Sequence, residues 1–554
     1  MHRPTERETL SLTALPRRAD LLVIGGGLGG VAAALTAVRL GRSVILVERG
    51  DWLGGQWTTQ AVPPDESPWV EEVASDSYRR LRETVRSLYR SQYPLTAHAH
   101  SQDRLNPGLG SVSRLTHEPR VGALAIESLL SPAIATGRLT VLRQREPIAV
   151  HRDDRRILAV DVRDRRSGEI VSLEGGVVVD ATELGDLLEL GAFDFVTGAE
   201  SRTQTGELHA IDNADPLDQQ AISWCFAVEH RPGENHVIDR PTSYSYWRDT
   251  HDPRWPGSQL SWVDVVPYTL DERYHSIFAG DPAKADSLDG DDFWHFRRVI
   301  GTRNFGPDYP DVTLVNWPQI DYWEKPLVGP GVDEPARQAA LAGARGLSES
   351  FLYWMQTEAP RADGGTGYPG LRLRPDVVGT DDGFAMEAYI RESRRIRALF
   401  TVTEAHIGRE MRGDAAAETF ADTVGIGSYR IDLHPSTSGR TYVDIGCHPF
   451  QIPLGALIPR DADNLIPANK NIGTTHITNG AYRLHPVEWS VGEAAGVLAV
   501  EALGTGLTTA AVHDTRTGDV QDVLRRLGAP LKWPEHIRTS GLEHDSIRNE
   551  TVSV

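Results

Sequence analysis

Cysteine is nearly missing from this chain: Cys225 and Cys447 are the only two among 554 residues. Two cysteines so far apart in sequence cannot form a disulfide framework or a cysteine-based metal site. A dithiol redox centre is excluded as well, because no C-x-x-C pair occurs. No zinc-spaced cluster stands out elsewhere, so we expect no metal, and the low cysteine content favours the cytoplasm.

Long apolar runs and an excess of positive charge are missing too. No run approaches the roughly eighteen apolar residues of a membrane helix, and the first residues lack the apolar core of a secretory signal. The chain holds 57 Lys and Arg against 77 Asp and Glu, a formal net charge of −20. Such a surface repels phosphate backbones. We therefore expect neither a membrane nor a nucleic acid as a partner.

Near its start the chain has a strand–helix–strand pattern. Residues 20–24 (DLLVI) form a continuous apolar run, which predicts a fully buried strand. Residues 31–40 follow a helical pattern that ends before a glycine, and residues 43–48 (SVILVE) predict a second buried strand. This is a βαβ unit, the element from which dinucleotide-binding folds are built.

Glycines occupy the turn between the first strand and the helix. Gly25, Gly27 and Gly30 follow the pattern G-x-G-x-x-G, and Gly29 lies in the same turn. Gly25 permits a tight turn, Gly27 lets the backbone approach a pyrophosphate, and Gly30 lets helix and strand pack closely. Glu48 ends the next strand, where a carboxylate is expected to bind ribose hydroxyls. The sequence thus predicts a dinucleotide site at the N-terminus of this helix.

The segment after the ribose-binding acid resembles the FAD site of glutathione-reductase-like flavoproteins. It contains Arg49 and, after a short gap, Gly54, Gly55 and Gln56. In those proteins a glycine pair at this place lines the pyrophosphate and the ribityl chain. Residues without Cβ let the backbone contact an extended cofactor. The resemblance implies that the dinucleotide is FAD.

A second match is the predicted strand that ends in Asp180, Ala181 and Thr182. It resembles the strand of this superfamily that ends in D-A-T-G and closes over FAD. Glu183 stands where the glycine is usual, which leaves the local backbone path open.

A third match lies near the C-terminus. Residues 464–468 look like the last strand of such folds, and the loop that follows carries Asn469 and Asn471. A long apolar helix is predicted over residues 487–503, beginning at Val487. The resemblance implies that its positive end points at the flavin, where a helix dipole stabilises negative charge.

Residues 389–396 (YIRESRRI) and 422–434 also resemble the family of FAD-dependent oxidoreductases, whose relatives include fumarate reductase and succinate dehydrogenase flavoproteins. The resemblance implies an α/β fold: a Rossmann-like FAD-binding domain of the two-dinucleotide-binding-domain type with an inserted α+β substrate domain. We expect a flexible leader, a first FAD-binding part, an inserted domain dense in tryptophan, a second FAD-binding part and a C-terminal extension, with the boundaries 1–19, 20–204, 205–395, 396–510 and 511–554.

Candidate catalytic residues gather directly before the C-terminal helix. A flavin dehydrogenase needs a base near its substrate and often a cation for an anionic group. His485 or His476 could serve as the acid or base, Arg483 could anchor the substrate, and Glu488 could orient a histidine. These side chains could instead pack and cap the helix. His434 lies in a neighbouring segment and is a weaker candidate.

Three arginines in another segment are expected to have a structural role as ion-pair partners. Arg391, Arg394 and Arg395 fall on one predicted helix, where pairing with Glu387 and Glu392 at the surface is the expected role.

Three functions remain open. The first is an FAD-dependent dehydrogenase or oxidase that transfers a hydride between a small organic substrate and flavin N5. The alternatives are a flavin-dependent monooxygenase and a non-redox isomerase or lyase. No second glycine fingerprint follows a predicted strand, so a separate NADPH domain is not expected. The substrate, the electron acceptor, a covalent FAD link and assembly as a homo-oligomer stay undecided.

Overall fold

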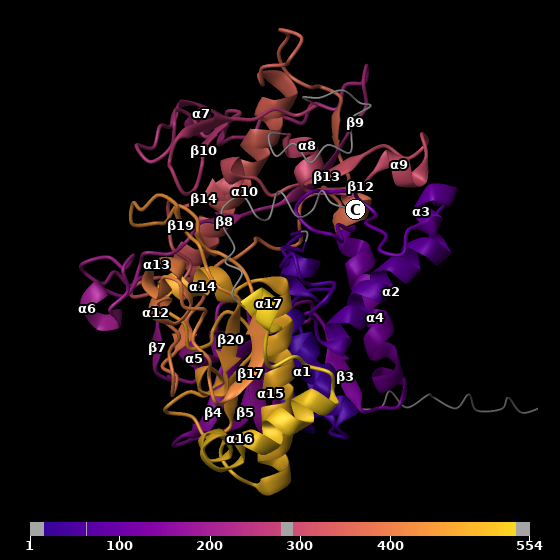
Figure 1. Cartoon of the computed structure of the whole chain (residues 1–554). Coiled ribbons are helices and arrows are strands. Elements are labelled where there is room, and N and C mark those ends of the chain that lie inside the picture. The colour runs from indigo at the N-terminus through magenta and orange to yellow at the C-terminus, as the bar shows by residue number, and fades with distance from the viewer. Residues whose placement is uncertain (1–15, 63, 279–291, 539–554) are drawn as a thin grey trace, which may run out of the picture.

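The computed structural model describes residues 16–62, 64–278 and 292–538. Parts of the predicted leader and of the predicted C-terminal extension therefore lie outside the described residues. The lower half of the molecule is built on a seven-stranded sheet (Figure 1). Its strands run in the order β3-β2-β1-β6-β5-β4, and β21 also pairs with β6; the bounds are β1 Arg18–Ile24, β2 Val44–Val47, β3 Leu139–Leu142, β4 Arg145–Asp153, β5 Arg156–Asp164, β6 Ile170–Asp180 and β21 Leu465–Pro467.

The parallel part of this sheet confirms the predicted Rossmann-like core. Strands β3, β2, β1, β6 and β21 are parallel, and Ile24 lies opposite both Val47 and Asp180. The predicted strands at 20–24 and 43–48 are β1 and β2. Strands β4 and β5 form an antiparallel hairpin beside β6. The carboxyl ends of β1, β2 and β6 meet at one edge, where α/β folds bind ligands.

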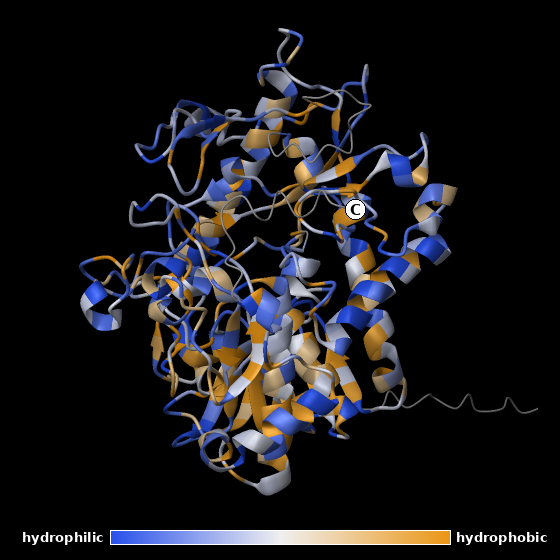
Figure 2. Cartoon of the chain, viewed as in Figure 1, coloured by the Kyte–Doolittle hydropathy of each residue, from blue (hydrophilic) through white to orange (hydrophobic). Residues whose placement is uncertain are grey.

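Two helices from opposite ends of the chain pack against one face of the sheet. Helix α1 (Leu28–Arg39) and helix α15 (His485–Thr505) lie side by side (Figure 1). Small residues make the contact: a Cβ added to Gly492 would overlap the carbonyl oxygen of Gly29. We call β1, β2, β6, β21, α1 and α15 the cradle. Helices α2 (Asp76–Gln92) and α4 (Pro119–Ala135) flank it, and Figure 2 shows α2 largely hydrophilic beside the hydrophobic strands.

The upper half has a core of its own, the aromatic region, made by residues 222–278 and 292–390. A four-stranded sheet in the order β12-β13-β9-β15 packs there with helix α10 (Glu334–Thr357). Phe293 stacks on Trp317, and Phe351 stacks on Trp354. The four strands are Phe226–His230 (β9), Arg298–Ile300 (β12), Val312–Val315 (β13) and Leu371–Leu373 (β15). The predicted domain boundaries stay predictions.

The prediction that Arg391, Arg394 and Arg395 lie on one helix is wrong. This segment is irregular and ends in the short strand β16 (Arg395–Ile396), which pairs with β7 (Phe195–Val196). Its arginines are buried rather than at the surface, with at most 2% of each exposed. Arg391 pairs with Asp321, Arg394 with Glu189 and Arg395 with Glu200 and Glu392. Mostly distant carboxylates, which local periodicity does not show, thus replace the expected helical pairs.

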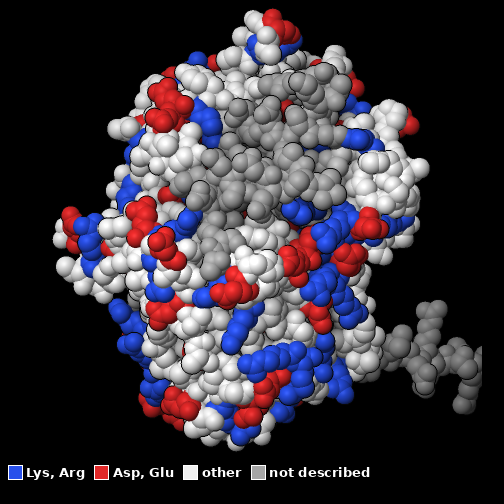
Figure 3. Space-filling view, in the orientation of Figure 1, with Lys and Arg blue, Asp and Glu red and all other residues white. Residues whose placement is uncertain are grey.

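The charges on the surface and the composition of the helices are relevant to the predictions about nucleic-acid and membrane partners. Basic and acidic side chains are interspersed over the face seen in Figure 3. Within the described ranges, no single helix has the length and apolar composition to cross a membrane; only α15 and α16 (Thr509–Arg526) meet those criteria as a pair, and they are bent by 103°.

Candidate functional site

The glycine turn of the cradle has one side that is closed by backbone and one that is open. Gly25 has a positive φ of 102°, and an added Cβ would overlap the carbonyl oxygen of Ala181. A Cβ on Gly29 would likewise overlap the carbonyl of Ala468, and one on Gly30 that of Gly25. A Cβ on Gly27 would meet only side-chain ends, the nearest being Glu488 Oε1 at 2.9 Å. Gly27 is therefore the position whose backbone a ligand can approach.

A cavity of about 980 Å³ opens at this turn. That volume is at the upper end of the range typical of ligand sites. The predicted cofactor residues in its wall are Gly25, Gly27, Glu48, Arg49, Gly55, Ala181 and Thr182. The cavity continues toward the aromatic region, where Trp224, Arg345 and Met386 line it.

The polar groups of this wall suit an extended dinucleotide. The carboxylate of Glu48 accepts hydrogen bonds from the N–H groups of Gly26 (2.8 Å) and Gly50 (2.6 Å). Burial, reinforced by the nearby Glu387, raises the pKa of Glu48 to about 7. Gln60 is fully buried in the same wall, and neither atom of its amide has a hydrogen-bond partner. An unused donor and acceptor facing a cavity match a polar cofactor edge.

Other predicted cofactor residues support the wall from behind. Asn469 and Asn471 donate from their side-chain amides to the carbonyls of Ala181 (3.3 Å) and Asp180 (3.0 Å), which fixes the end of β21 to the end of β6. Gly54 takes a positive φ of 116° in the loop before the short 3-10 helix Gly55–Trp57. Asp180 is buried, and burial raises its pKa to about 7.

The structure does not bring Val487 to the large cavity. Its side chain packs against Gly427 at the end of strand β17 (Thr423–Gly427), beside a smaller pocket. The residue of α15 that does reach the glycine turn is Glu488. Its carboxylate accepts hydrogen bonds from the Gly29 N–H (3.0 Å) and from Gln56 Nε2 (2.5 Å).

A buried lysine lies beside this glutamate, and the sequence did not reveal it. Lys470 is 2% exposed and its ammonium donates to the Glu183 carboxylate and to Asn469 Oδ1 (3.1 Å). Its charge also acts on Glu488, as does that of Glu183. Two carboxylates and one ammonium therefore share the space in front of the glycine turn. A polar residue in a loop is ordinarily exposed, so no local pattern marked Lys470 or Gln60.

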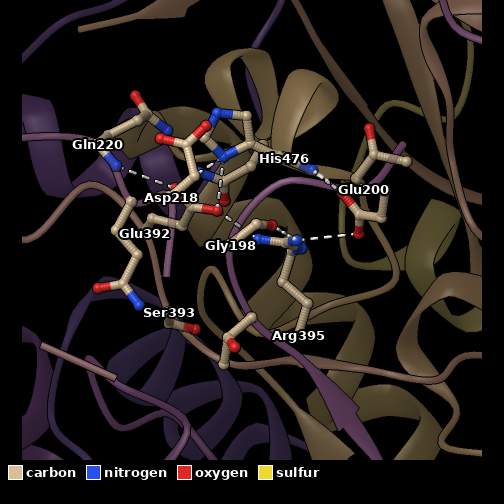
Figure 4. Close-up of polar contacts among 12 residues, drawn as sticks. Gly198, Glu200, Asp218, Gln220, Glu392, Ser393, Arg395 and His476 are labelled. Atoms are coloured by element: carbon tan, nitrogen blue, oxygen red, sulfur yellow. Dashed lines mark hydrogen bonds and ion pairs between the residues drawn. The ribbon is translucent and has the colours of Figure 1, made fainter. Parts of the chain in front are cut away.

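The two predicted catalytic histidines have different environments. His485 is fully buried, its Nδ1 accepts the Asp65 N–H (3.1 Å), and burial lowers its pKa to about 3. His476 begins helix α14 (His476–Tyr482), and its Nδ1 contacts both carboxylate oxygens of Glu392 at 3.0 and 3.1 Å (Figure 4). Burial alone would lower the pKa of His476, but Glu392 outweighs it and the pKa is raised. His485 is thus neutral, whereas His476 belongs to an ion pair.

Arg483 connects the cofactor side to a second acid–base group. Its backbone carbonyl accepts from Gln56 (3.0 Å), and its guanidinium donates to Tyr389 (2.6 Å) and to Asp432 Oδ2 (3.0 Å). Asp432 in turn lies 3.4 Å from His434 Nε2. Burial opposes ionisation of Asp432, but His434 and Arg483 hold its pKa below the usual range.

His434 is itself fixed by a carboxylate of the aromatic region. Its Nδ1 lies 2.5 Å from Asp321 Oδ2, and the other oxygen of Asp321 accepts from Ser223 (2.6 Å) and Arg391 (2.9 Å). The sequence did not reveal this pair, because its members are 113 positions apart in the chain. The four predicted catalytic residues do not line the large cavity; Glu488 lies beside Gly27 of its wall, and Gln56 connects Glu488 to Arg483. Within the described residues no group of three metal-ligating side chains occurs.

Comparison with known proteins identifies the family of this chain. The family model described as FAD dependent oxidoreductase matches residues 20–527. No curated protein matches the sequence. Among solved structures, the myxobacterial chondrochloren halogenase is 12% identical over 92% of this chain and 79% of its own, with a TM-score of 0.32. A geranylgeranyl bacteriochlorophyll reductase-like protein of Thermoplasma acidophilum is 10% identical over 92% and 88%, with a TM-score of 0.31.

The glycerol-3-phosphate dehydrogenase of Bacillus halodurans, complexed with FAD, is 16% identical over 38% of this chain, with a TM-score of 0.22. This chain spans 40% of that dehydrogenase. TM-scores this low carry no argument about the reaction. The family match covers most of the sequence and agrees with the glycine turn, the cavity and the parallel sheet. The chain belongs to the family of FAD dependent oxidoreductases, and its cofactor is FAD.

Proposed function

We propose that this protein is a dehydrogenase or oxidase of a small organic substrate. The observation that carries the proposal is a continuous series of polar contacts, buried near the glycine turn and partly buried at its far end, that leads to a histidine–carboxylate pair. It runs from Glu488 through Gln56 to Arg483, and from there through Asp432 to His434 and Asp321. When bound, FAD supplies a hydride-accepting position at N5. An oxidation also needs a group that takes the proton, and His434 is suited to that task.

The pair is built as an oriented acid–base group. Asp321 is fully buried and receives hydrogen bonds from Ser223 and Arg391, so its carboxylate cannot turn away from His434. A histidine whose Nδ1 is held by a carboxylate presents Nε2 as the exchanging atom. Arg483 holds Asp432 near that atom. The arrangement supports proton removal from a hydroxyl or amine as the hydride leaves the adjacent carbon.

The other candidates keep narrower roles within this proposal. The neutral His485 has an unpartnered Nε2 and can only donate a hydrogen bond there, because its Nδ1 already accepts one. His476 is bound to Glu392, which belongs to the segment that also carries Tyr389 and Arg391. We also propose that the fold is related to that of the glutathione-reductase-like flavoproteins; the parallel strands β1, β6 and β21 and helix α15 support this proposal.

Anaerobic titration of the purified yellow protein with small alcohols, amines and hydroxy acids tests the proposal. A substrate should bleach the visible flavin absorbance without oxygen present. NADPH consumption with incorporation of oxygen would select a monooxygenase instead. Turnover without any change in the flavin spectrum would select an isomerase or lyase.

Replacing His434 by Ala then tests its role. We expect flavin reduction by the substrate to slow by about 10²- to 10⁴-fold, the usual contribution of a general base, while the FAD content stays normal. The matched control is His151→Ala, which removes an equally close pair, with Asp161 at 2.7 Å, from the exposed β4–β5 hairpin. Equal reduction rates for the two variants would remove His434 from the mechanism.

A further inference from the structure

Glu488 occupies the place where an anion is expected to bind in this fold. Its Oε1 accepts the N–H of Gly29 in the first turn of α1, at the positive end of that helix. It also lies 2.9 Å from the position of a Cβ on Gly27, a glycine of the turn that lines the cavity and whose Cβ position meets only side-chain ends. The FAD diphosphate needs the same turn and the same helix end.

The charges around this position do not balance once a diphosphate is added. Glu488 and Glu183 bring two negative charges, and Lys470 brings one positive charge; Glu488 and Lys470 are buried, and the Glu183 side chain is 14% exposed. The oxygens of both glutamates face Gly27, since Glu183 Oε1 lies 3.4 Å from the same Cβ position. A diphosphate adds two more negative charges, and like charges repel strongly where water is excluded. One carboxylate must therefore become neutral or leave when the cofactor enters.

We propose that Glu488 takes up a proton when FAD binds and then acts as a neutral hydrogen-bond donor beside the diphosphate. Glu488 is the member of the cluster on the anion-binding helix end, and Glu183 keeps its ammonium partner, Lys470. Protonation turns an acceptor that competes with phosphate into a donor that complements it. The inference rests on the FAD site alone and is independent of the substrate proposed above.

The electrostatics of the site agree with this assignment. The pKa of Glu488 is raised to about 7, mainly by burial. The charge of Lys470 opposes this rise, and the charge of Glu183 adds to it. The groups facing Glu488 are Gly29 from α1, Gln56 from the loop after β2, Lys470 from the loop after β21 and Glu183 from the loop after β6. The pKa of Lys470 is raised, so the lysine stays charged through neutral pH. Glu48 also titrates in this cavity, but as a ribose acceptor it works ionised and has the opposite effect on FAD binding.

The test compares FAD affinity in the wild type and in Glu488→Gln. Holoprotein is diluted into buffers from about pH 6 to about pH 9, a range that spans the ordinary titration of such groups, and free FAD is measured by its fluorescence. The dissociation constant of the wild type divided by that of the variant should rise by about tenfold per pH unit above neutrality, the slope for one linked proton. Taking the ratio cancels the contribution of Glu48. A ratio that stays constant with pH overturns the proposal.

Two further variants keep the test decisive. Glu493→Gln is the matched control: Glu493 lies on the same helix, is 3% exposed and has its pKa raised to about 7 by burial, but it pairs with Ser77 away from the turn. The wild-type dissociation constant for FAD divided by that of Glu493→Gln should not change with pH. Glu183→Gln removes the neighbour that raises the pKa of Glu488, so weakening of FAD binding should begin at a lower pH than in the wild type. An unshifted onset in this variant contradicts the proposal even if Glu488→Gln does not fold.

Discussion

The cradle and the aromatic region fill their cores with opposite kinds of residue. In the cradle, backbone packs on backbone: Gly29 lies against the Ala468 carbonyl, and Gly492 against that of Gly29. In the aromatic region, Phe351 packs between Trp262, Trp317 and Trp354. The cradle has no room for an added atom, whereas the aromatic region depends on the bulk of each ring. Cofactor binding requires close backbone approach, and that requirement explains the difference.

The two regions also treat buried carboxylates differently. In the cradle, burial raises the pKa values of Glu48, Asp180, Glu488 and Glu493 to about 7. In the aromatic region, burial acts in the same direction on Asp264, but hydrogen bonds from His275 and Arg273 outweigh it and lower the pKa. The cradle therefore holds acids that take up protons near neutral pH, and the aromatic region holds ion pairs.

The largest effect should come from adding one methyl group to the cradle. Gly29→Ala places a Cβ on the Ala468 carbonyl oxygen, a backbone atom, so we expect the loss in the free energy of unfolding to exceed the roughly 1–3 kcal/mol of ordinary overpacking. Alanine normally stabilises a helix relative to glycine, so the sign is reversed here. Gly27→Ala is the control, because its Cβ meets only side-chain ends; it should fold normally and bind FAD weakly. Thermal unfolding and FAD content would separate them, and a Gly29→Ala protein of normal stability would refute the contrast.

The opposite change should damage the aromatic region. Phe351→Ala leaves a cavity among three tryptophans and should cost about 3–5 kcal/mol in the free energy of unfolding. The folded fraction should still bind FAD in full, because the cradle has its own core. Denaturant unfolding followed by tryptophan fluorescence and by flavin release measures both. If FAD were lost in proportion to stability, the two cores would not be independent.

The smallest expected effect concerns pH. The pKa of Glu493 is raised in the folded protein, so this group makes the fold less stable as pH rises from about 4.5 to about 7. Glu493→Gln should therefore stabilise the protein at pH 8 by roughly 1–3 kcal/mol and have little effect near pH 4.5.

Asp264→Asn should show the reverse dependence on pH. The pKa of Asp264 is lowered, so its stabilising contribution is present at neutral pH and disappears as pH falls through the folded-state pKa. Unfolding curves at several pH values check both signs. Parallel pH profiles for the two variants would contradict the electrostatic contrast between the regions.

Local patterns in the sequence were sufficient to predict the first strand and the glycine turn of the cradle. The apolar run at 20–24, the glycines after it and Glu48 are contiguous signals, and the structure arranges them as expected. A local signal also marks the start of helix α10: Asp333 caps it, and a proline lies in its first turn.

Contacts between distant residues could not be predicted. The Asp321–His434 pair and the burial of Lys470 depend on segments that meet only in the folded chain. The prediction for the segment 389–396 was wrong for the same reason. Its charges suggested a surface helix, but its arginines bind Asp321, Glu189 and Glu200, which lie 70, 205 and 195 residues away.

The contact between Gly29 and Glu488 spans 459 residues, and it has a consequence for biosynthesis. At a translation rate of roughly 5–20 residues per second, the ribosome needs roughly 20 to 90 seconds to make the second half of this contact after the first. During that interval the first strands emerge without α15 and β21 to cover them. We therefore expect FAD loading to follow the synthesis of β21 and α15.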